Sequence, residues 1–262
     1  MSSQTESQVF LITGGSRGIG LGVTEVLLQQ GQQVVSFSRS LTPELSSLQE
    51  SHPGKLFVLQ GDLTSNEACA NAVSKTIAHF GRLDGVVLNA ASGGPFARVL
   101  DVRDEDVLST LATNVLSAYA IVRASIPELR KSRREGRGGR VAVVSSVVVG
   151  GGAGISVYCA SKAALNTFVA SVAQEEPDIT FVAIDPGVVD TKMSKAYREE
   201  GGKVMTPEMH GWLVAVHAEN KLTTPIQVGA SIAAVALHAP QTMSGKFVVW
   251  NSDEVNALME AK

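Results

Sequence analysis

The sequence predicts an α/β fold in which a doubly wound parallel sheet of about seven strands carries helices on both faces. Short runs rich in Val, Ile and Leu recur along the chain, and stretches with helix-spaced apolar residues separate them. Strands that are apolar throughout are buried on both faces, and strands that alternate with helices pair in parallel through right-handed crossovers. Such strands are expected at 9–13, 33–38, 55–60, 84–89, 140–146, 180–185 and 246–250.

Helices are expected at 18–31, 65–80, about 106–131 and 156–175, with Ser65 as an N-cap. No repeat, linker or low-complexity break divides the chain, so residues 1–262 are expected to form a single domain. The segment 192–222 is richer in charge, Gly and Met than the rest. Because it follows the sixth strand, we expect it to form a lid over a substrate site.

Composition excludes several classes of protein. The net charge of −3 provides no global basic field for nucleic acid. Two cysteines cannot form a disulfide framework in a chain of 262 residues, and the five histidines lack metal-site spacing. The N-terminus lacks the features of a signal peptide, and no apolar run reaches the roughly 18 residues of a membrane span. We expect a soluble cytoplasmic protein that binds neither nucleic acid, membrane nor metal.

A glycine-rich segment follows the first expected strand and opens the first expected helix. Glycines at this place let the backbone approach a pyrophosphate, and the helix N-terminus supplies free N–H groups. The position between strand and helix predicts a Rossmann-like dinucleotide site, whereas a bare turn is the weaker alternative. The residues expected to hold the cofactor here are Gly14, Ser16, Arg17, Gly18, Ile19 and Gly20.

The end of the second strand selects between NAD and NADP. An acidic residue there would hold a ribose hydroxyl, whereas a cation would accept a 2′-phosphate. The segment contains Ser38 and Arg39 and no acid, and Arg39 and Arg17 are able to converge on a phosphate. We therefore predict NADPH, with two ordinary surface arginines as the alternative.

Two further strand ends point to the same crevice. Asp62, which precedes Leu63, follows the third strand, where it either contacts the adenine or starts a turn. Asn89, followed by Ala90, ends the fourth strand, and a structural and a cofactor-binding role are equally compatible with it.

Tyr158 and Lys162 are four residues apart in a predicted helix, so their side chains share a face. A phenol with a pKa near 10 is a poor acid–base group, and a neighbouring cation lowers that pKa. Tyr158 is then able to give a proton to a carbonyl oxygen as hydride arrives. One hydroxyl of Ser145-Ser146 is expected to bond the same oxygen, and Asn114 in the long helix to anchor a water next to Lys162.

Taken together, these motifs resemble the classical short-chain dehydrogenase/reductase family from about residue 9 to 251. The chain matches Thr-Gly-x-x-x-Gly-x-Gly at 13–20, the helix asparagine at Asn114, Tyr-x-x-x-Lys at 158–162 and Pro-Gly-x-x-x-Thr at 186–191. The resemblance implies that Ser, Tyr, Lys and Asn carry catalysis. It also implies dimers or tetramers formed through the helices at 106–131 and 156–175.

The resemblance assigns further roles and leaves one assignment open. Pro186 and Gly187 would line the cofactor, and Val189 and Thr191 would hold the nicotinamide carboxamide. The loop between the serines and Tyr158 is one residue shorter than usual in the family. Counting back from the tyrosine points to Ser145, and the Ser-Val-Val pattern points to Ser146, which we prefer.

Within the family, residues 158–176 and 185–191 are similar to fungal benzil reductases and sepiapterin reductases. We therefore expect an NADPH-dependent reductase of ketones or diketones, with Tyr158 as general acid and a small carbonyl compound as substrate. The alternatives are an NAD(P)-dependent alcohol dehydrogenase that works oxidatively and a non-catalytic NADP-binding sensor.

Overall fold

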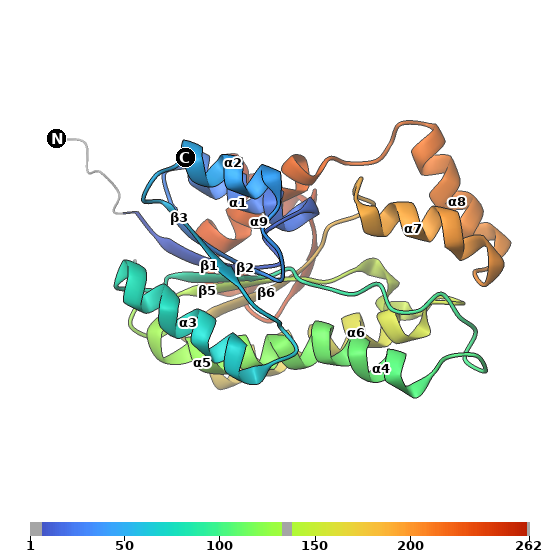
Figure 1. Cartoon of the computed structure of the whole chain (residues 1–262), viewed down its shortest axis with the longest axis horizontal. Coiled ribbons are helices and arrows are strands. Elements are labelled where there is room, and N and C mark those ends of the chain that lie inside the picture. The colour runs from blue at the N-terminus through green and yellow to red at the C-terminus, as the bar shows by residue number, and fades with distance from the viewer. Residues whose placement is uncertain (1–6, 133–137, 261–262) are drawn as a thin grey trace.

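The structure, a computed structural model, describes residues 7–132 and 138–260. Its sheet has seven parallel strands in the order β3-β2-β1-β4-β5-β6-β7, which confirms the predicted fold class (Figure 1). The strands are β1 (Val9–Thr13), β2 (Gln33–Ser38), β3 (Leu56–Gln60), β4 (Gly85–Leu88), β5 (Arg140–Val144), β6 (Thr180–Asp185) and β7 (Phe247–Val249).

The strand order reverses at β1, which pairs with β2 on one side and β4 on the other. Loops that leave the carboxyl ends of β1 and β4 diverge to opposite faces of the sheet, and ligands of open α/β sheets bind in the crevice between them. At the amino end of β4, a Cβ at Gly85 would lie 2.4 Å from the ring of Phe10, so this position requires glycine. A ligand crevice is expected at the opposite end, beyond the carboxyl ends of β1 and β4.

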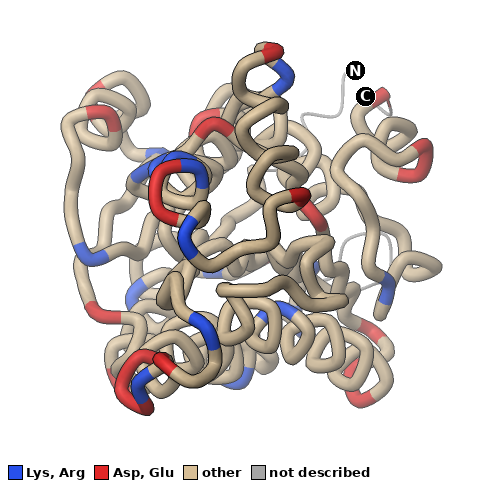
Figure 2. Tube along the Cα trace, turned by 90° about the vertical axis from the view of Figure 1, so that its right-hand side faces the viewer, with Lys and Arg blue, Asp and Glu red and all other residues tan. Residues whose placement is uncertain are grey.

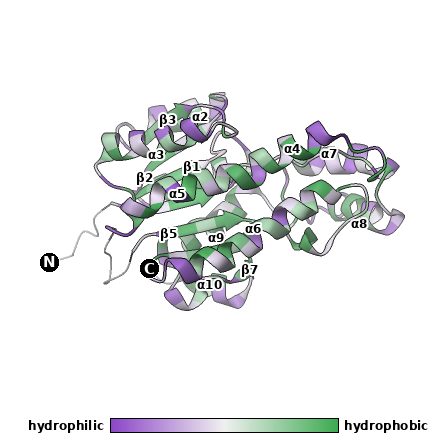
Figure 3. Cartoon of the chain, turned by 90° about the horizontal axis from the view of Figure 1, so that it is seen from below, coloured by the Kyte–Doolittle hydropathy of each residue, from purple (hydrophilic) through white to green (hydrophobic). Residues whose placement is uncertain are grey.

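Two layers of helices cover the sheet, and each has its own hydrophobic core. One core joins α1, α2, α9 and α10 to the sheet, and the other joins α3, α5 and α6 to its opposite face. The strands between them are hydrophobic (Figure 3). The helices are α1 (Gly18–Gln29), α2 (Pro43–Ser51), α3 (Asn66–Phe80), α4 (Asp104–Leu111), α5 (Ser117–Leu129), α6 (Ser156–Glu175), α7 (Lys192–Glu200), α8 (Pro207–Ala218), α9 (Pro225–His238) and α10 (Asp253–Glu260).

Three of the helices begin with the same Thr-Pro pair. The threonines at 42, 206 and 224 are N-caps whose hydroxyls accept a backbone N–H of the first turn, and proline follows at the first helical position. Proline needs no hydrogen-bond partner there, and its fixed φ suits the helix. Ser65 caps α3 as expected, with its side chain accepting from the N–H of Ala68.

The expected helix at 106–131 runs from Asp104 to Leu129 as α4, a π-helical turn η1 (Ala112–Leu116) and α5. By length and composition alone this helix would fit a membrane span, as many core helices do. Its residues Ala118, Ile121 and Val122 are buried in the core that it shares with α3 and α6. The helix is thus a packing element of this fold.

The segment expected to be a lid folds into α7, a 3-10 turn η3 (Gly201–Lys203) and α8. These elements project from the carboxyl end of the sheet, at the same end of the molecule as α4 (Figures 1 and 3). At this end, basic and acidic residues are interspersed along the chain (Figure 2). Within the described ranges, no three His, Cys, Asp or Glu side chains gather as a metal site.

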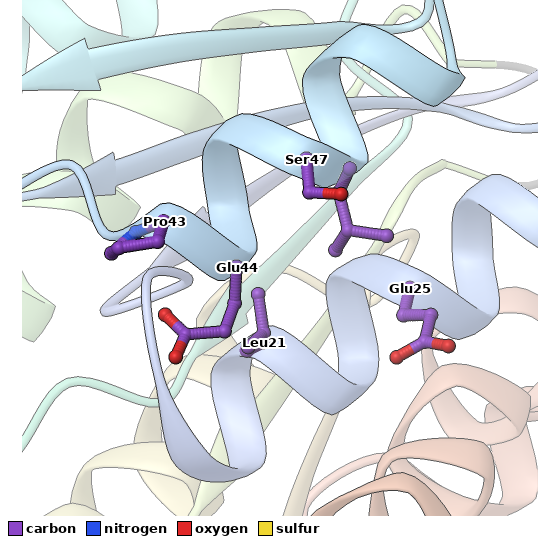
Figure 4. Close-up of a pocket in the computed structure, with 6 residues that line it drawn as sticks. Leu21, Glu25, Pro43, Glu44 and Ser47 are labelled. Atoms are coloured by element: carbon purple, nitrogen blue, oxygen red, sulfur yellow. The ribbon is translucent and has the colours of Figure 1, made fainter.

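A shallow groove lies between α1 and α2, away from the predicted chemistry. Leu21 and Glu25 of α1 face Pro43, Glu44 and Ser47 of α2 across it (Figure 4). None of these side chains belongs to the predicted catalytic set.

Candidate active site

The glycine loop between β1 and α1 is shaped by close backbone approaches. Gly14 and Gly18 have positive φ angles of 69° and 54°, which L side chains rarely adopt. A Cβ at Gly20 would lie 2.3 Å from the carbonyl oxygen of Gly14. The loop is therefore a cradle that only glycine permits, and it delivers the N-terminus of α1 to the crevice.

Asn89 braces this cradle. Its side-chain amide donates to the carbonyls of Thr13 at 3.1 Å and Gly14 at 3.2 Å. In return, the Thr13 hydroxyl accepts the backbone N–H groups of Asn89 and Ala90. Of the two roles open to Asn89, the contacts in the structure are structural ones.

The end of β2 carries polar side chains close to the glycine loop. The hydroxyl of Ser38 is buried without a hydrogen-bond partner in the described part of the chain. Arg39 is exposed, and the guanidinium of Arg17 donates to Ser40 at 2.9 Å. Since a buried hydroxyl without a partner is unfavourable, Ser38 is suited to a ligand's polar group.

The two cofactor-binding residues expected after the third strand have different surroundings. Asp62 starts a turn, because its carboxylate accepts the N–H of Thr64 at 2.9 Å. These hydrogen bonds from Thr64 lower the pKa of Asp62, and the charge of Arg39 adds to the effect. Leu63 is buried in the core below α3. Asp62 thus lies beside Arg39, whereas Leu63 contributes packing.

Ser16 and Ile19 complete the loop. Ser16 is buried, and its carbonyl accepts the hydroxyl of Thr42 at 2.8 Å. Ile19 packs against the core on the α1 side of the sheet. The side chains of both residues face the protein interior, so they would contact a bound cofactor only through their backbone N–H groups.

Lys192 is a basic residue near the start of α2 that sequence reasoning missed. The pKa of Glu44 is lowered by a backbone hydrogen bond, by the hydroxyl of Thr42 and by the charges of Lys192 and Arg17. Two cations therefore meet near the N-terminus of α2. A basic residue directly after the Pro-Gly-x-x-x-Thr segment was the available signal.

The segment from Pro186 to Thr191 forms the facing wall. Val189 is buried and pairs with Thr223, and Thr191 caps α7 with a reciprocal capping box to Ser194. The methyl group of Thr191 lies 3.4 Å from the place of a Cβ at Gly18. The glycine loop and this segment thus lie against each other, and the glycine cradle, the helix N-terminus and the Ser38 hydroxyl fit a dinucleotide.

Tyr158 lies near the start of α6, and its surroundings keep the phenol protonated. Burial raises the pKa of Tyr158, a hydrogen bond from the Ser146 side chain opposes the rise, and the negative charge of Asp185 adds to it. The expected lowering by a neighbouring cation is therefore wrong in direction for the protein alone. Desolvation of the phenolate is the largest cause of the shift, and the Nζ of Lys162 lies 5.7 Å from the centre of the tyrosine ring.

Lys162 is buried one turn along α6, with only 2% of its surface exposed. Its Nζ donates to the carbonyl oxygen of Val144 at 2.6 Å, which anchors it at the end of β5. Burial lowers the pKa of Lys162 to about 8. The amine therefore titrates close to neutral pH.

The two adjacent serines after β5 have different surroundings. Ser145 is 1% exposed, and its hydroxyl donates to Asn166 at 2.6 Å behind the sheet end. Ser146 lies on the Tyr158 side, where its side chain interacts with the phenol. The interaction with the phenol favours Ser146 as the partner of Tyr158, whereas the bond to Asn166 commits Ser145 to α6.

Asp185 is a second residue of the site that spacing alone did not indicate. It ends β6, is 2% exposed, and accepts the N–H of Val147 at 3.0 Å. Burial raises the pKa of its carboxyl, and bonds from the N–H groups of Val147 and Gly187 oppose the rise. The carboxylate thus fixes the backbone next to Ser146. A charged residue at the end of an otherwise apolar strand was the signal.

Asn114 lies in the π-helical turn and is 2% exposed. Its side chain accepts the N–H of Ser92 at 2.7 Å and donates to the carbonyl of the same residue at 2.9 Å. It also donates to the hydroxyl of Ser161 at 2.9 Å. Its side chain is committed to the loop after β4 and to α6. Single π turns often mark functional sites.

An apolar cluster covers Tyr158 from the lid side. Tyr197, Met205 and Leu213 of the lid are buried in it with Ile155 and Cys159. Met193 and Met209 pack against it, whereas Trp212 of the lid is 51% exposed. The catalytic tyrosine candidate is therefore bounded by aromatic and sulfur-containing side chains.

Comparison with known proteins decides the family. The short chain dehydrogenase family model matches residues 8–202. This chain belongs to the short-chain dehydrogenase/reductase family. It is 35% identical over 257 residues to an uncharacterized oxidoreductase of Schizosaccharomyces pombe, covering 95% of this chain and 99% of that protein.

Two further members of the short-chain dehydrogenase/reductase family are similar over nearly their whole length. A Saccharomyces cerevisiae benzil reductase that forms (S)-benzoin is 31% identical over 258 residues, covering 95% of this chain and 97% of the relative. A crystal structure of a short-chain dehydrogenase/reductase from the same yeast superposes with a TM-score of 0.90 at 29% identity, covering 97% of this chain and 100% of that one. The protein is thus an oxidoreductase of the family that uses a nicotinamide cofactor.

Proposed function

We propose that this protein reduces ketones and vicinal diketones with NADPH, and that Tyr158 is the general acid. The observation that carries the proposal is the placement of Tyr158 under the apolar cluster, with the buried Lys162 Nζ 5.7 Å from its ring centre and the Ser146 side chain interacting with a phenol whose pKa is raised by burial. A protonated phenol is the form that reduction of a carbonyl requires. The similarity to the yeast benzil reductase supports this substrate class.

The residues divide the work as follows. The hydroxyls of Ser146 and Tyr158 hydrogen-bond the carbonyl oxygen and stabilise the negative charge that develops there. NADPH, when bound, supplies the hydride to the carbonyl carbon. Tyr158 then delivers its proton to the oxygen. Lys162 holds the ribose of the nucleotide, and its ammonium charge stabilises the phenolate that Tyr158 becomes. Asn114 hydrogen-bonds both the loop that follows β4 and the helix α6, and so holds these two elements in place around the centre.

We assign NADPH rather than NADH to the cleft because of its charges. The charges of Arg17 and Lys192 both act on Glu44 at the start of α2, Arg39 follows β2, and the end of β2 carries Ser38 and no acid. Arginine binds phosphate through its planar fork of donors. Replacing Arg39 by Ala is expected to lower the preference for NADPH over NADH about tenfold, as loss of one charge-assisted hydrogen bond would. An unchanged ratio of kcat/KM values for the two cofactors would remove Arg39 from the phosphate site.

The residues Gly14, Ser16, Gly18, Ile19 and Gly20 would hold the pyrophosphate through backbone N–H groups at the start of α1. Beyond the loop, the adenosine would contact the third and fourth strand ends, and the nicotinamide would lie against the β6 exit. The residues assigned to these parts are Asp62, Leu63, Asn89, Ala90, Pro186, Gly187, Val189 and Thr191.

We also propose that the protein works in the cytoplasm as a homodimer or homotetramer, with residues 192–222 as the lid of one catalytic domain. Both cysteines are free and buried, in keeping with a reducing compartment. Leu108, Leu116 and Tyr119 are more than half exposed on the helix of α4 and α5. Exposed apolar residues on one helix suit a subunit interface. Light scattering of Leu116→Glu against the unmodified protein tests this, and an unchanged mass would reject that helix as the interface.

The decisive test of the activity uses Tyr158→Phe, which keeps the ring and removes the proton donor. NADPH consumption with 1-phenyl-1,2-propanedione is expected to fall by about 10²–10⁴-fold in kcat. Binding of NADPH, followed by its fluorescence, is expected to stay within about threefold, because the ring and Lys162 remain. Unchanged turnover would reject Tyr158 as the acid.

A further inference from the structure

The most deeply buried contact of helix α7 is made by one aromatic side chain. Lysines, arginine and glutamates make up most of α7, whereas Tyr197 is buried with 8% of its surface exposed and Met193 packs beside it. A polar helix with a single inward aromatic residue is docked by that residue. The position of the first lid helix over the site therefore depends on what Tyr197 contacts.

Tyr197 contacts the catalytic centre directly. Its ring centre lies 6.0 Å from that of Tyr158 with an interplanar angle of 70°, and 4.9 Å from that of Phe96 at 85°. Both are edge-to-face arrangements, which aromatic pairs favour. Three rings from α6, α7 and the loop after β4 thus meet at the place where the carbonyl substrate must lie.

The hydroxyl of Tyr197 is fixed by a hydrogen bond to the opposite side of the cleft. It donates to the carbonyl oxygen of Gly93 at 3.3 Å. A Cβ at Gly93 would lie 3.3 Å from the tyrosine ring, so the glycine permits the close approach. Burial raises the pKa of Tyr197, and the phenol remains a donor at every working pH.

The acceptor of this bond is itself held to the catalytic helix. The Asn114 side chain hydrogen-bonds the backbone N–H and the carbonyl oxygen of Ser92, the residue before Gly93. It also donates to the hydroxyl of Ser161 in α6. The Ser161 hydroxyl in turn donates to the carbonyl of Tyr158 at 2.7 Å. One chain of hydrogen bonds therefore connects the lid, the loop after β4 and the catalytic tyrosine.

We propose that Tyr197 is the specificity-determining residue of this reductase: it latches the lid to Gly93 and presents its ring to carbonyl compounds with a flat aromatic substituent. The inference rests on the proposed function and adds to it the residue that selects the substrate. The methionines beside the ring suit the same class, because sulfur packs favourably on aromatic edges.

Two variants separate the two roles proposed for Tyr197, which are the aromatic wall of the substrate site (the wall) and the hydrogen-bonded closure of the lid onto Gly93 (the latch). Tyr197→Ala removes the ring, and Tyr197→Phe keeps the ring but removes the hydrogen bond. The probes are 1-phenyl-1,2-propanedione and 2,3-hexanedione, which share the vicinal dicarbonyl and differ in the phenyl group. The readout is the ratio of their kcat/KM values, which a merely structural defect would not move.

The unmodified enzyme is expected to prefer the phenyl diketone, and Tyr197→Ala to lower the ratio by about tenfold, the size of an aromatic pair plus its buried area. Tyr197→Phe is expected to keep the ratio and to raise KM for both diketones about three- to tenfold. Trp212→Ala, an exposed aromatic residue on the same lid, serves as the matched control and should leave the ratio unchanged.

An unmoved ratio in Tyr197→Ala would overturn the wall, and an unmoved KM in Tyr197→Phe would overturn the latch. If the alanine variant fails to fold by circular dichroism, Tyr197→Leu replaces it, because leucine keeps much of the volume without an aromatic face. Failure of the proposed function is recognised separately: the unmodified enzyme would then consume no NADPH with either diketone.

Discussion

At the cofactor end of the cleft, shape is set by backbone atoms that approach one another where glycine leaves room. Gly20 meets the carbonyl of Gly14 there, and the amide of Asn89 ties the loop to β4. At the lid end, shape is set by large side chains, with Tyr197 contacting Gly93 across 104 positions of sequence. The cofactor end is therefore expected to tolerate no added atoms, whereas the lid end is able to change its substrate by exchanging side chains.

The reacting centre between the two ends gives the largest expected effect. Ser146→Ala removes a hydroxyl that stabilises the developing oxyanion, and kcat is expected to fall about 10²–10³-fold with NADPH binding unchanged. Ser145→Ala is the matched control, because its hydroxyl is bonded to Asn166 instead. The stopped-flow rate of NADPH oxidation measures both. A larger loss for Ser145→Ala than for Ser146→Ala would reverse the assignment of the two serines.

A change at the cofactor end is expected to act on binding rather than on chemistry. In Gly20→Ala the new Cβ would lie 2.3 Å from the Gly14 carbonyl, so the loop has to move. Overpacking of this kind costs about 1–3 kcal/mol, which corresponds to a fall in NADPH affinity of about 5–150-fold. Isothermal titration measures this affinity.

The matched control for that change is Gly211→Ala in α8, where an added Cβ meets no atom within 4 Å. This variant is expected to keep its NADPH affinity and to gain up to about 1 kcal/mol of stability from helix propensity. Equal affinities for the two variants would show that the cradle does not depend on glycine.

The pH dependence of activity tests the role of Lys162 at the reacting centre. Burial lowers its pKa to about 8, so the ammonium is lost as pH rises through that value. If the cation holds the ribose, kcat/KM for reduction falls about tenfold per pH unit above 8. Lys162→Arg stays charged and is expected to lose this limb of the profile, whatever its absolute rate. A flat profile from pH 7 to 10 in the unmodified enzyme would contradict the role.

The same shift has the opposite sign for stability. Between pH about 8 and 10.5 the folded protein holds fewer protons on Lys162 than the unfolded chain does, so the stability contributed by this group rises with pH. Activity and stability are therefore expected to diverge in this window, and chemical denaturation at pH 8 and 10 measures the stability term.

Much of the framework was predictable because it depends on local patterns. Apolar runs gave the strands β1, β2 and β6 to the residue, and the glycine motif placed the nucleotide loop before α1. The helix α2 was missed, although Thr42-Pro43 carries the same start signal as two later helices. The π-helical turn at Asn114 has no periodic signature that sequence inspection detects.

The chemistry was less predictable because it depends on burial and on distant contacts. The spacing of Tyr158 and Lys162 indicated a lowered phenol pKa, but burial of the ring reverses the direction. The pairing of Tyr197 with Gly93, and the approach of Asp185 to the backbone beside Ser146, join residues far apart in sequence. Such contacts follow only from the folded arrangement of β4, β6 and α7.

The central claim is that hydride from NADPH reaches a carbonyl carbon beside Tyr158. The most direct measurement is reduction of 1-phenyl-1,2-propanedione with NADPH carrying deuterium at both C4 positions of the nicotinamide, with the product analysed by mass spectrometry and NMR. Deuterium is expected on the new carbinol carbon, with this product lost in Tyr158→Phe. No labelled alcohol from the unmodified enzyme, despite bound NADPH, would contradict the account.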